Sequence, residues 1–100
     1  MRGRPIKERF IQKPPRIFKF SPRGIRGRPD KVILQTDELE AIRLADLNNM
    51  KHQDAAGVMR VSRQTFDRIL KKGRKALADG IVSGKIVTIR DIPKNTTSKQ

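Results

Sequence analysis

The 100-residue chain contains no cysteine, no tryptophan and no tyrosine, so its four phenylalanines are all that it has of the large aromatic residues. The lack of cysteine excludes disulfides and thiolate metal sites, and it fits a reducing cytoplasm. No apolar run approaches the roughly 18 residues that a membrane span requires, and no apolar stretch follows the basic N-terminus as in a signal peptide. We therefore expect a cytoplasmic protein with one small aliphatic core and no membrane partner.

Residue groups that would carry catalysis are also missing. The sequence offers no nucleophile beside a base, no phosphate-binding loop and no metal-ligand cluster, and its one histidine, His52, has no partner at ligand spacing. The acidic residues Asp37, Glu38 and Glu40 are better explained as compensation of a helix dipole than as a metal or acid–base site. We expect no enzymatic activity, no metal and no cofactor.

Positive charge is what the chain has in excess. Twenty-four Lys and Arg residues outnumber ten Asp and Glu residues, which gives a formal net charge of +14. The charge is uneven, with +9 over residues 1–31, −3 over residues 32–59 and +5 over residues 60–79. Such a field attracts polyanions, so the sequence predicts a nucleic-acid partner, with DNA and RNA equally open at this point.

The hydrophobic pattern divides the chain into three parts. Residues 1–30 form a basic N-terminal arm and a loop with proline and glycine, in which residues 17–20 are a candidate short strand. Residues 31–90 hold the folded domain, with strands expected at 32–34 and 85–89 that pair into a small two-stranded element. Residues 91–100 are polar and are expected to be a disordered tail.

Three helices are predicted within the folded domain, so the fold is expected to be mainly α. The first spans about 37–47 with Thr36 as its N-cap, and Leu39, Ile42, Leu44 and Leu47 lie on its apolar positions. The second spans about 52–59, and its small inward face includes Met59.

The third helix is expected at about 63–79 with Ser62 as its N-cap. Phe66, Leu70, Gly73 and Leu77 recur on one face, and Gly73 suggests a close contact with another helix. Either Gly80 or Gly84 is expected to break the pattern.

A short helix, a turn of about three residues and a capped basic helix form the pattern of a helix-turn-helix. In that arrangement the first turns of the third helix enter the major groove of DNA, where Arg suits guanine, Gln suits adenine and Asp accepts from cytosine. Basic residues further along the helix meet phosphates, and so do amides at the start of the second helix. The predicted DNA-binding residues are Ser62, Arg63, Gln64, Thr65, Asp67, Arg68, Lys71, Arg74 and Lys75, together with His52 and Gln53.

A second basic feature is the tetrapeptide RGRP, which occurs at residues 2–5 and 26–29. Arginines in such extended segments can lie in the narrow minor groove of A·T-rich DNA. Arg2, Arg4, Arg26 and Arg28 are therefore candidate minor-groove contacts, with a plain basic loop as the alternative.

The runs DELEAIRLADL and VSRQTFDRIL, with FKFSPRGI upstream, resemble the family catalogued as domain of unknown function 134, or uncharacterised protein family 0251. The resemblance covers most of residues 4–90, and its central segment is similar to the helix-turn-helix of sigma factor region four. It implies DNA binding and a role in transcription regulation.

The chain departs from the family pattern at three places. The family usually has a small polar residue where Lys51 stands and glycine where Arg60 stands, so the resemblance implies a weaker helix start and a strained turn here. Some relatives have a cysteine near the N-terminus, and this chain has none.

Because one helix-turn-helix reads only a few base pairs, we expect either a homodimer or contacts of the N-terminal arm that extend the site. The strand at 85–89 is one candidate for edge pairing between subunits. The alternatives to DNA binding are binding of RNA, for example on the ribosome, and a module that binds RNA polymerase.

Overall fold

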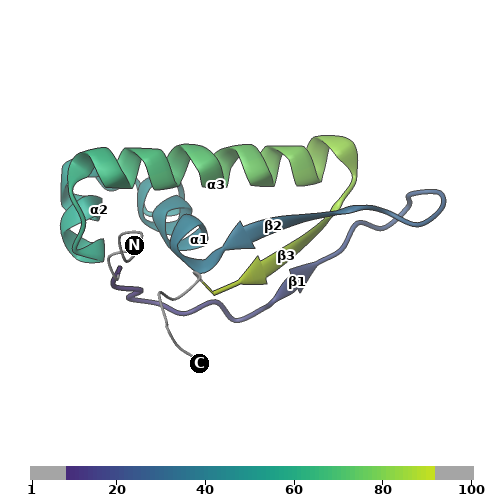
Figure 1. The fold of residues 1–100 in the computed structure, drawn as a ribbon, viewed down its shortest axis with the longest axis horizontal. Coiled ribbons are helices and arrows are strands. Elements are labelled where there is room, and N and C mark those ends of the chain that lie inside the picture. The colour runs from purple at the N-terminus through teal and green to yellow at the C-terminus, as the bar shows by residue number, and fades with distance from the viewer. Residues whose placement is uncertain (1–8, 92–100) are drawn as a thin grey trace, which may run out of the picture.

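The computed structural model describes residues 9–91 (Figure 1). About half of these residues are helical, which confirms the expected mainly α composition. In chain order the elements are β1 (Lys19–Phe20), β2 (Lys31–Gln35), α1 (Thr36–Ile42), the π-helical segment η1 (Arg43–Leu47), α2 (His52–Met59), α3 (Arg63–Ser83) and β3 (Ile86–Arg90). The predicted tail, apart from Asp91, and residues 1–8 of the predicted arm lie outside the described residues.

The sheet has three strands, in the order β1-β3-β2, and not the two that the sequence predicted. The expected pairing is present, because β2 and β3 run parallel with Val32 opposite Val87 and Leu34 opposite Ile89. The third strand, β1, adds antiparallel to the other edge of β3. It was predicted only as a candidate because two residues carry almost no periodicity.

The central position of β3 also corrects the idea that this strand joins two subunits. Both of its edges are already hydrogen-bonded, one to β1 and one to β2. Within residues 9–91, the free edges of the sheet belong to β1 and β2.

The first predicted helix, 37–47, is one helical run with two geometries. Its first part, α1, begins at Thr36, so the expected cap residue is already helical and the cap is Gln35. The side chain of Glu38 turns back and accepts a hydrogen bond from the Gln35 amide at 2.9 Å. Its second part, η1, closes with the wider π spacing, so Leu47 leaves the apolar face and is 74% exposed.

Two groups of buried side chains form the core. One joins α1, η1, α2 and the first half of α3, and it contains Phe66, Leu70 and Met59 at its centre. The other joins the sheet to the second half of α3 through Leu34, Val87 and Ile89. The predicted inward face of the third helix is therefore confirmed, with Leu77 at its half-buried margin.

Glycines allow the close approaches that α3 makes at its midpoint and near its C-terminal end. A Cβ atom on Gly73 would lie 2.9 Å from the Cβ of Glu38, so α1 and α3 touch there as expected. A Cβ on Gly80 would lie 2.5 Å from Val87 Cγ2, so the glycine at this position lets α3 pack closely against the sheet. The helix does not end at Gly80. The helix continues to Ser83 and ends at Gly84, which has φ 67°.

Buried carboxylates of α1 hold the N-terminal segment against the helices. Asp37 Oδ2 lies 3.3 Å from Arg9 Nε, and Glu40 Oε2 accepts a hydrogen bond from the Gln12 amide at 2.8 Å. Burial raises the pKa of Asp37. These acids were predicted only to compensate the helix dipole; in the fold they also position residues 9–12. No helix in the described ranges is both long and apolar enough to cross a membrane.

Candidate nucleic-acid interface

Helix α3 starts with the cap that the sequence predicted. The hydroxyl of Ser62 accepts a hydrogen bond from the Thr65 amide at 3.1 Å and donates to the Thr65 hydroxyl at 3.0 Å. This satisfies one of the amides that a helix leaves open in its first turn. Both side chains therefore form hydrogen bonds that stabilise the start of α3. These bonds fix the backbone of the first turn, which carries Arg63 and Gln64.

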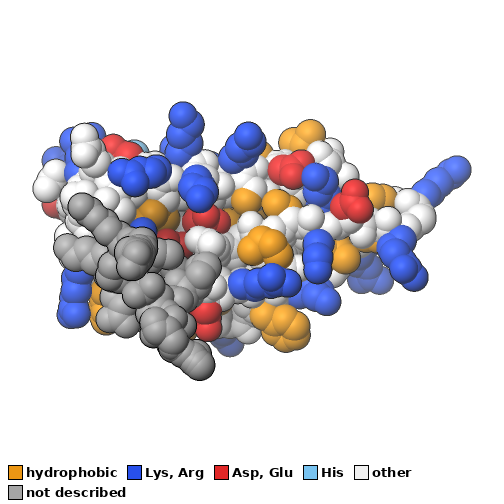
Figure 2. Space-filling model, in the orientation of Figure 1, with side chains coloured by type: hydrophobic (Ala, Val, Ile, Leu, Met, Phe, Trp, Pro, Cys, Tyr) orange, Lys and Arg blue, Asp and Glu red, His pale blue; other side chains and the backbone are white. Residues whose placement is uncertain are grey.

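The predicted contact residues of α3 share the side of the helix that faces solvent. Phe66, Ile69 and Leu70 are buried against the other helices, and this orients the opposite side outward. Lys and Arg side chains project along the edge of the molecule where α3 lies (Figure 2). Among the predicted contacts in this helix, Thr65 is half-buried. The others are exposed, and they are Arg63, Gln64, Asp67, Arg68, Lys71, Arg74 and Lys75.

Four of these residues form what we call the outer face of α3: Gln64, Arg68, Lys71 and Lys75. They follow one another at intervals of three or four residues, which places them in one stripe along the helix. Within residues 9–91 none of them takes part in an ion pair. Three cations outside these ion pairs and an amide on one stripe form a surface suited to an anionic, hydrogen-bonding partner.

Two further predicted contacts are tied to other parts of the protein. Asp67 Oδ1 lies 2.9 Å from Nδ1 of His52, and its Oδ2 lies 3.8 Å from Nε of Arg63. The edge of the His52 ring also meets Phe66, with 5.5 Å between ring centroids. The carboxylate of Asp67 therefore links the start of α2 to the start of α3.

Arg74 is the second tied residue, because it forms a bidentate pair with Asp46 of η1. Its Nη2 and Nε donate to the two carboxylate oxygens at 2.6 and 3.1 Å. These hydrogen bonds lower the pKa of Asp46 and raise the pKa of Arg74. A phosphate at this place would have to share Arg74 with Asp46.

The turn between α2 and α3 has the backbone strain that the resemblance to the family implied for Arg60. Arg60 caps the C-terminus of α2 in the left-handed region, with φ 59° and ψ 42°. Its guanidinium lies 4.4 Å from the centroid of the Phe10 ring, and the Phe10 amide donates to the Met59 carbonyl at 2.9 Å. Sequence reasoning missed Phe10, because no local pattern marks a contact across nearly fifty residues.

The start of α2 offers fewer interactions than the start of α3. Lys51 is the N-cap and makes no side-chain capping bond, as the departure from the family pattern implied. Gln53 is exposed and His52 is half-buried. A phosphate contact at these amides stays a prediction.

The loop with the second RGRP lies far from these helix starts. Arg26 and Arg28 are exposed on the loop between β1 and β2, which projects at one end of the long axis. Helix α2 and the start of α3 occupy the other end (Figure 1). The fold thus does not bring this loop to the outer face of α3, and Arg2 and Arg4 fall outside the described residues.

In the described part of the chain, no group of three or more His, Cys, Asp or Glu side chains is arranged to hold a metal ion. Asp37, Glu40 and Asp46 each face an arginine instead.

Comparison with known proteins gives a family. The model of the family described as "Protein of unknown function DUF134" matches residues 1–93. The chain is 49% identical over 88 residues to a UPF0251 protein of Chlorobaculum tepidum, which covers 87% of this chain and 58% of that relative. It is 48% identical over 86 residues to a UPF0251 protein of Caldicellulosiruptor bescii, with 86% of this chain and 60% of the relative covered.

A third relative, a UPF0251 protein of Chlorobium chlorochromatii, is 45% identical over 89 residues, which is 88% of this chain and 50% of the relative. The chain therefore spans between half and three fifths of the length of these relatives. No solved structure matches it significantly. The family match over nearly the whole chain confirms the resemblance found in the sequence: the protein belongs to the DUF134 family, whose curated members are named UPF0251 proteins.

Proposed function

We propose that this protein binds double-stranded DNA with sequence preference, through a helix-turn-helix made of α2, the Arg60–Ser62 turn and α3, and that it regulates transcription. The observation that carries the proposal is the outer face of α3. Its cations are exposed and unpaired among residues 9–91, while the inward face of the same helix is locked in the core. A rigid basic helix presented in this way has the width that the DNA major groove accepts.

Within this proposal the residues divide by their place along α3. Arg63 and Gln64 lie in the first turn, which enters the groove most deeply, so they read base edges. Lys71 and Lys75 lie two to three turns later, so they meet phosphates and supply affinity that depends on salt. Arg68 lies between these two groups.

Asp67 has a supporting role in this arrangement. It was predicted from the sequence to accept a hydrogen bond from cytosine, and its hydrogen bond with His52 and its ion pair with Arg63 favour a different assignment. We assign it to orienting Arg63 and to holding α2 against α3. Arg74, which is shared with Asp46, contributes less to the complex than Lys71 or Lys75.

A second copy of the chain completes the site in this proposal, because a single helix contacts only three or four base pairs. The pairing surface is not β3, which has no free edge. A twofold dimer predicts a palindromic target with half-sites about 34 Å, or one helical turn, apart.

The test is selection of bound sequences from a random pool of duplex DNA at physiological salt, with structured RNA present as competitor. The proposal expects an enriched motif of a few base pairs, repeated as an inverted pair. Enrichment of no motif, or displacement of the DNA by structured RNA at equal concentration, would contradict it and favour an RNA-binding role. A complex with RNA polymerase that survives nuclease treatment, without any selected motif, would favour the interaction-module alternative.

A further inference from the structure

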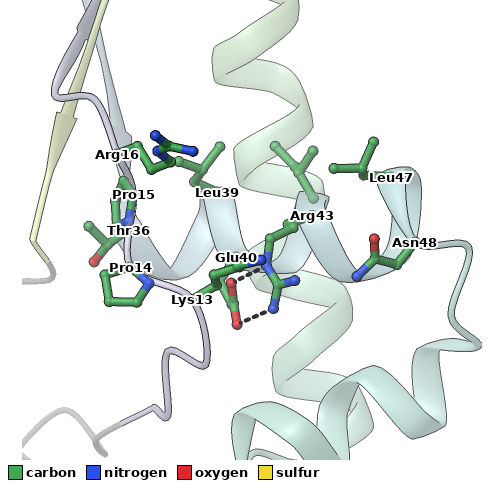
Figure 3. Close-up of a pocket in the computed structure, with 11 residues that line it drawn as sticks. Lys13, Pro14, Pro15, Arg16, Thr36, Leu39, Glu40, Arg43, Leu47 and Asn48 are labelled. Atoms are coloured by element: carbon green, nitrogen blue, oxygen red, sulfur yellow. Dashed lines mark hydrogen bonds and ion pairs between the residues drawn. The ribbon is translucent and has the colours of Figure 1, made fainter.

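An open groove separates the N-terminal segment from the first helices. It encloses about 450 Å³ and lies between residues 13–16 on one side and α1 with η1 on the other (Figure 3). This volume is within the range of sites that hold small organic molecules, about 300 to 1,000 Å³. The groove is separate from the outer face of α3, and the proposed DNA contacts use none of its lining residues.

Five of the eleven side chains that line the groove are apolar. Pro14 and Pro15 form part of one wall, and Leu39 and Leu47 lie on the opposite wall (Figure 3). Ile42 of α1 also lines the groove. Leu47 is 74% exposed because the π-helical turn has rotated it out of the core. An apolar ligand surface that covered Leu47 and Leu39 would remove this area from water, which is favourable at about 25 cal/mol per Å².

The charged side chains that line the groove leave a net positive charge. Glu40 is fully buried and forms an ion pair with Arg43. The Nε and Nη2 atoms of Arg43 donate hydrogen bonds to the two carboxylate oxygens of Glu40 at 2.8 and 3.0 Å. The Gln12 amide also donates to this carboxylate. Two cations then remain, Lys13 and Arg16, and neither takes part in an ion pair with any described residue.

We propose that this groove is a binding site for a small organic acid, with an apolar ring or chain against Leu39 and Leu47 and an anionic group that pairs with Lys13 or Arg16. The apolar walls select the body of the ligand, and the uncompensated charge selects its head group. A cation is disfavoured because the only carboxylate in the lining is already paired with Arg43. The site does not depend on DNA binding and can be tested without DNA.

The probe is the aromatic sulfonate 8-anilinonaphthalene-1-sulfonate, compared with the uncharged analogue N-phenyl-1-naphthylamine. The chain has neither tryptophan nor tyrosine, so the fluorescence of the probe is read without protein background. We expect saturable binding of one sulfonate per chain and at least tenfold weaker binding of the neutral analogue. Amide NMR shifts on titration with the sulfonate should centre on Arg16, Leu39 and Leu47.

The double variant Lys13→Gln/Arg16→Gln should weaken sulfonate binding about tenfold. The variant Leu47→Gln should weaken both probes. All three side chains are exposed, so these variants keep the fold. The matched control is Lys19→Gln/Arg23→Gln, which removes the same charge at β1 and the following loop and should leave sulfonate binding unchanged.

Three results would overturn the proposal. They are equal binding of the neutral and anionic probes, equal loss of binding in the control and the groove variants, and amide shifts centred on exposed Phe20 of β1 and on exposed Phe18, just before that strand. The third result would place the apolar anion on the sheet edge. None of them bears on DNA selection, so failure here is distinct from failure of the proposed function.

Discussion

His52 Nδ1 lies 2.9 Å from Asp67 Oδ1, so one contact joins the first turn of α2 to the second turn of α3. The contact is partly exposed, and the His52 ring also rests its edge against buried Phe66. The relative position of the two helices thus depends on a polar pair at the surface as well as on the core.

The first prediction concerns this pair. A double-mutant cycle with His52→Ala and Asp67→Ala should give a coupling of about 0.5 kcal/mol in the free energy of unfolding, the usual size for an exposed pair. Urea denaturation measures it. A cycle of Asp67→Ala with Lys75→Ala serves as the control, because these residues do not touch and their effects should add. Additivity in the His52 cycle would remove Asp67 from the positioning role.

The second prediction concerns the contact between α1 and α3. Gly73→Ala should lower the free energy of unfolding by about 1–3 kcal/mol, because the added Cβ would meet the Cβ of Glu38 at 2.9 Å and its carbonyl oxygen at 3.1 Å. The control is Gly57→Ala in α2, where nothing lies within 4 Å. That change should stabilise the protein by about 0.5–1 kcal/mol, since alanine favours the helix. If Gly57→Ala lowered the free energy of unfolding and Gly73→Ala did not, the close contact between α1 and α3 would be contradicted.

The third prediction concerns the strained turn. Arg60→Gly should leave the protein about 1 kcal/mol more stable than Arg60→Ala. Both variants lose the contact with the Phe10 ring, but only glycine relieves the left-handed backbone at φ 59°. Thermal unfolding of the two variants side by side gives the difference. Equal stabilities would mean that the turn relaxes once the arginine side chain is gone.

The fourth prediction concerns pH. Asp46 has a pKa below its ordinary value because Arg74 donates hydrogen bonds to it, so the folded state binds its proton less readily than the unfolded state. The contribution of ionised Asp46 to the free energy of unfolding is therefore complete at pH values above the ordinary aspartate pKa. It is lost as the pH falls through the lowered pKa of the folded state. Asp46→Asn should be less stable than the parent at neutral pH and equal to it at about pH 2. A difference that persisted unchanged in acid would assign the effect to packing.

The fifth prediction rests on the proposed function. Arg63→Ala should weaken binding to a selected DNA site by about 1–3 kcal/mol and relax the preference at one base pair. Lys75→Ala should weaken binding to all sequences alike and reduce the dependence on salt. Arg90→Ala on β3 removes the same charge away from α3 and should do neither. A base preference that survives Arg63→Ala would exclude the first turn of α3 as the reading element.

Local pattern was sufficient for α2 and for the start of α3, although it placed the end of α3 at residue 79 and the helix continues to Ser83. The bounds of α2, the cap at Ser62 and the inward turn of Phe66 and Leu70 were all predicted and are confirmed. These features depend on neighbours within four or five residues, which a sequence displays directly. The exposure of the predicted contacts in α3 follows from the same periodicity.

Contacts between distant residues were decided by the tertiary structure alone. The pairs His52–Asp67, Asp46–Arg74 and Phe10–Arg60 each join elements that are separated in the chain, and nothing in their local sequence indicates a partner. The addition of β1 to the sheet and the groove beside residues 13–16 have the same origin. Periodicity determines which side of a helix faces inward, whereas the packing of the whole chain determines which polar groups meet there.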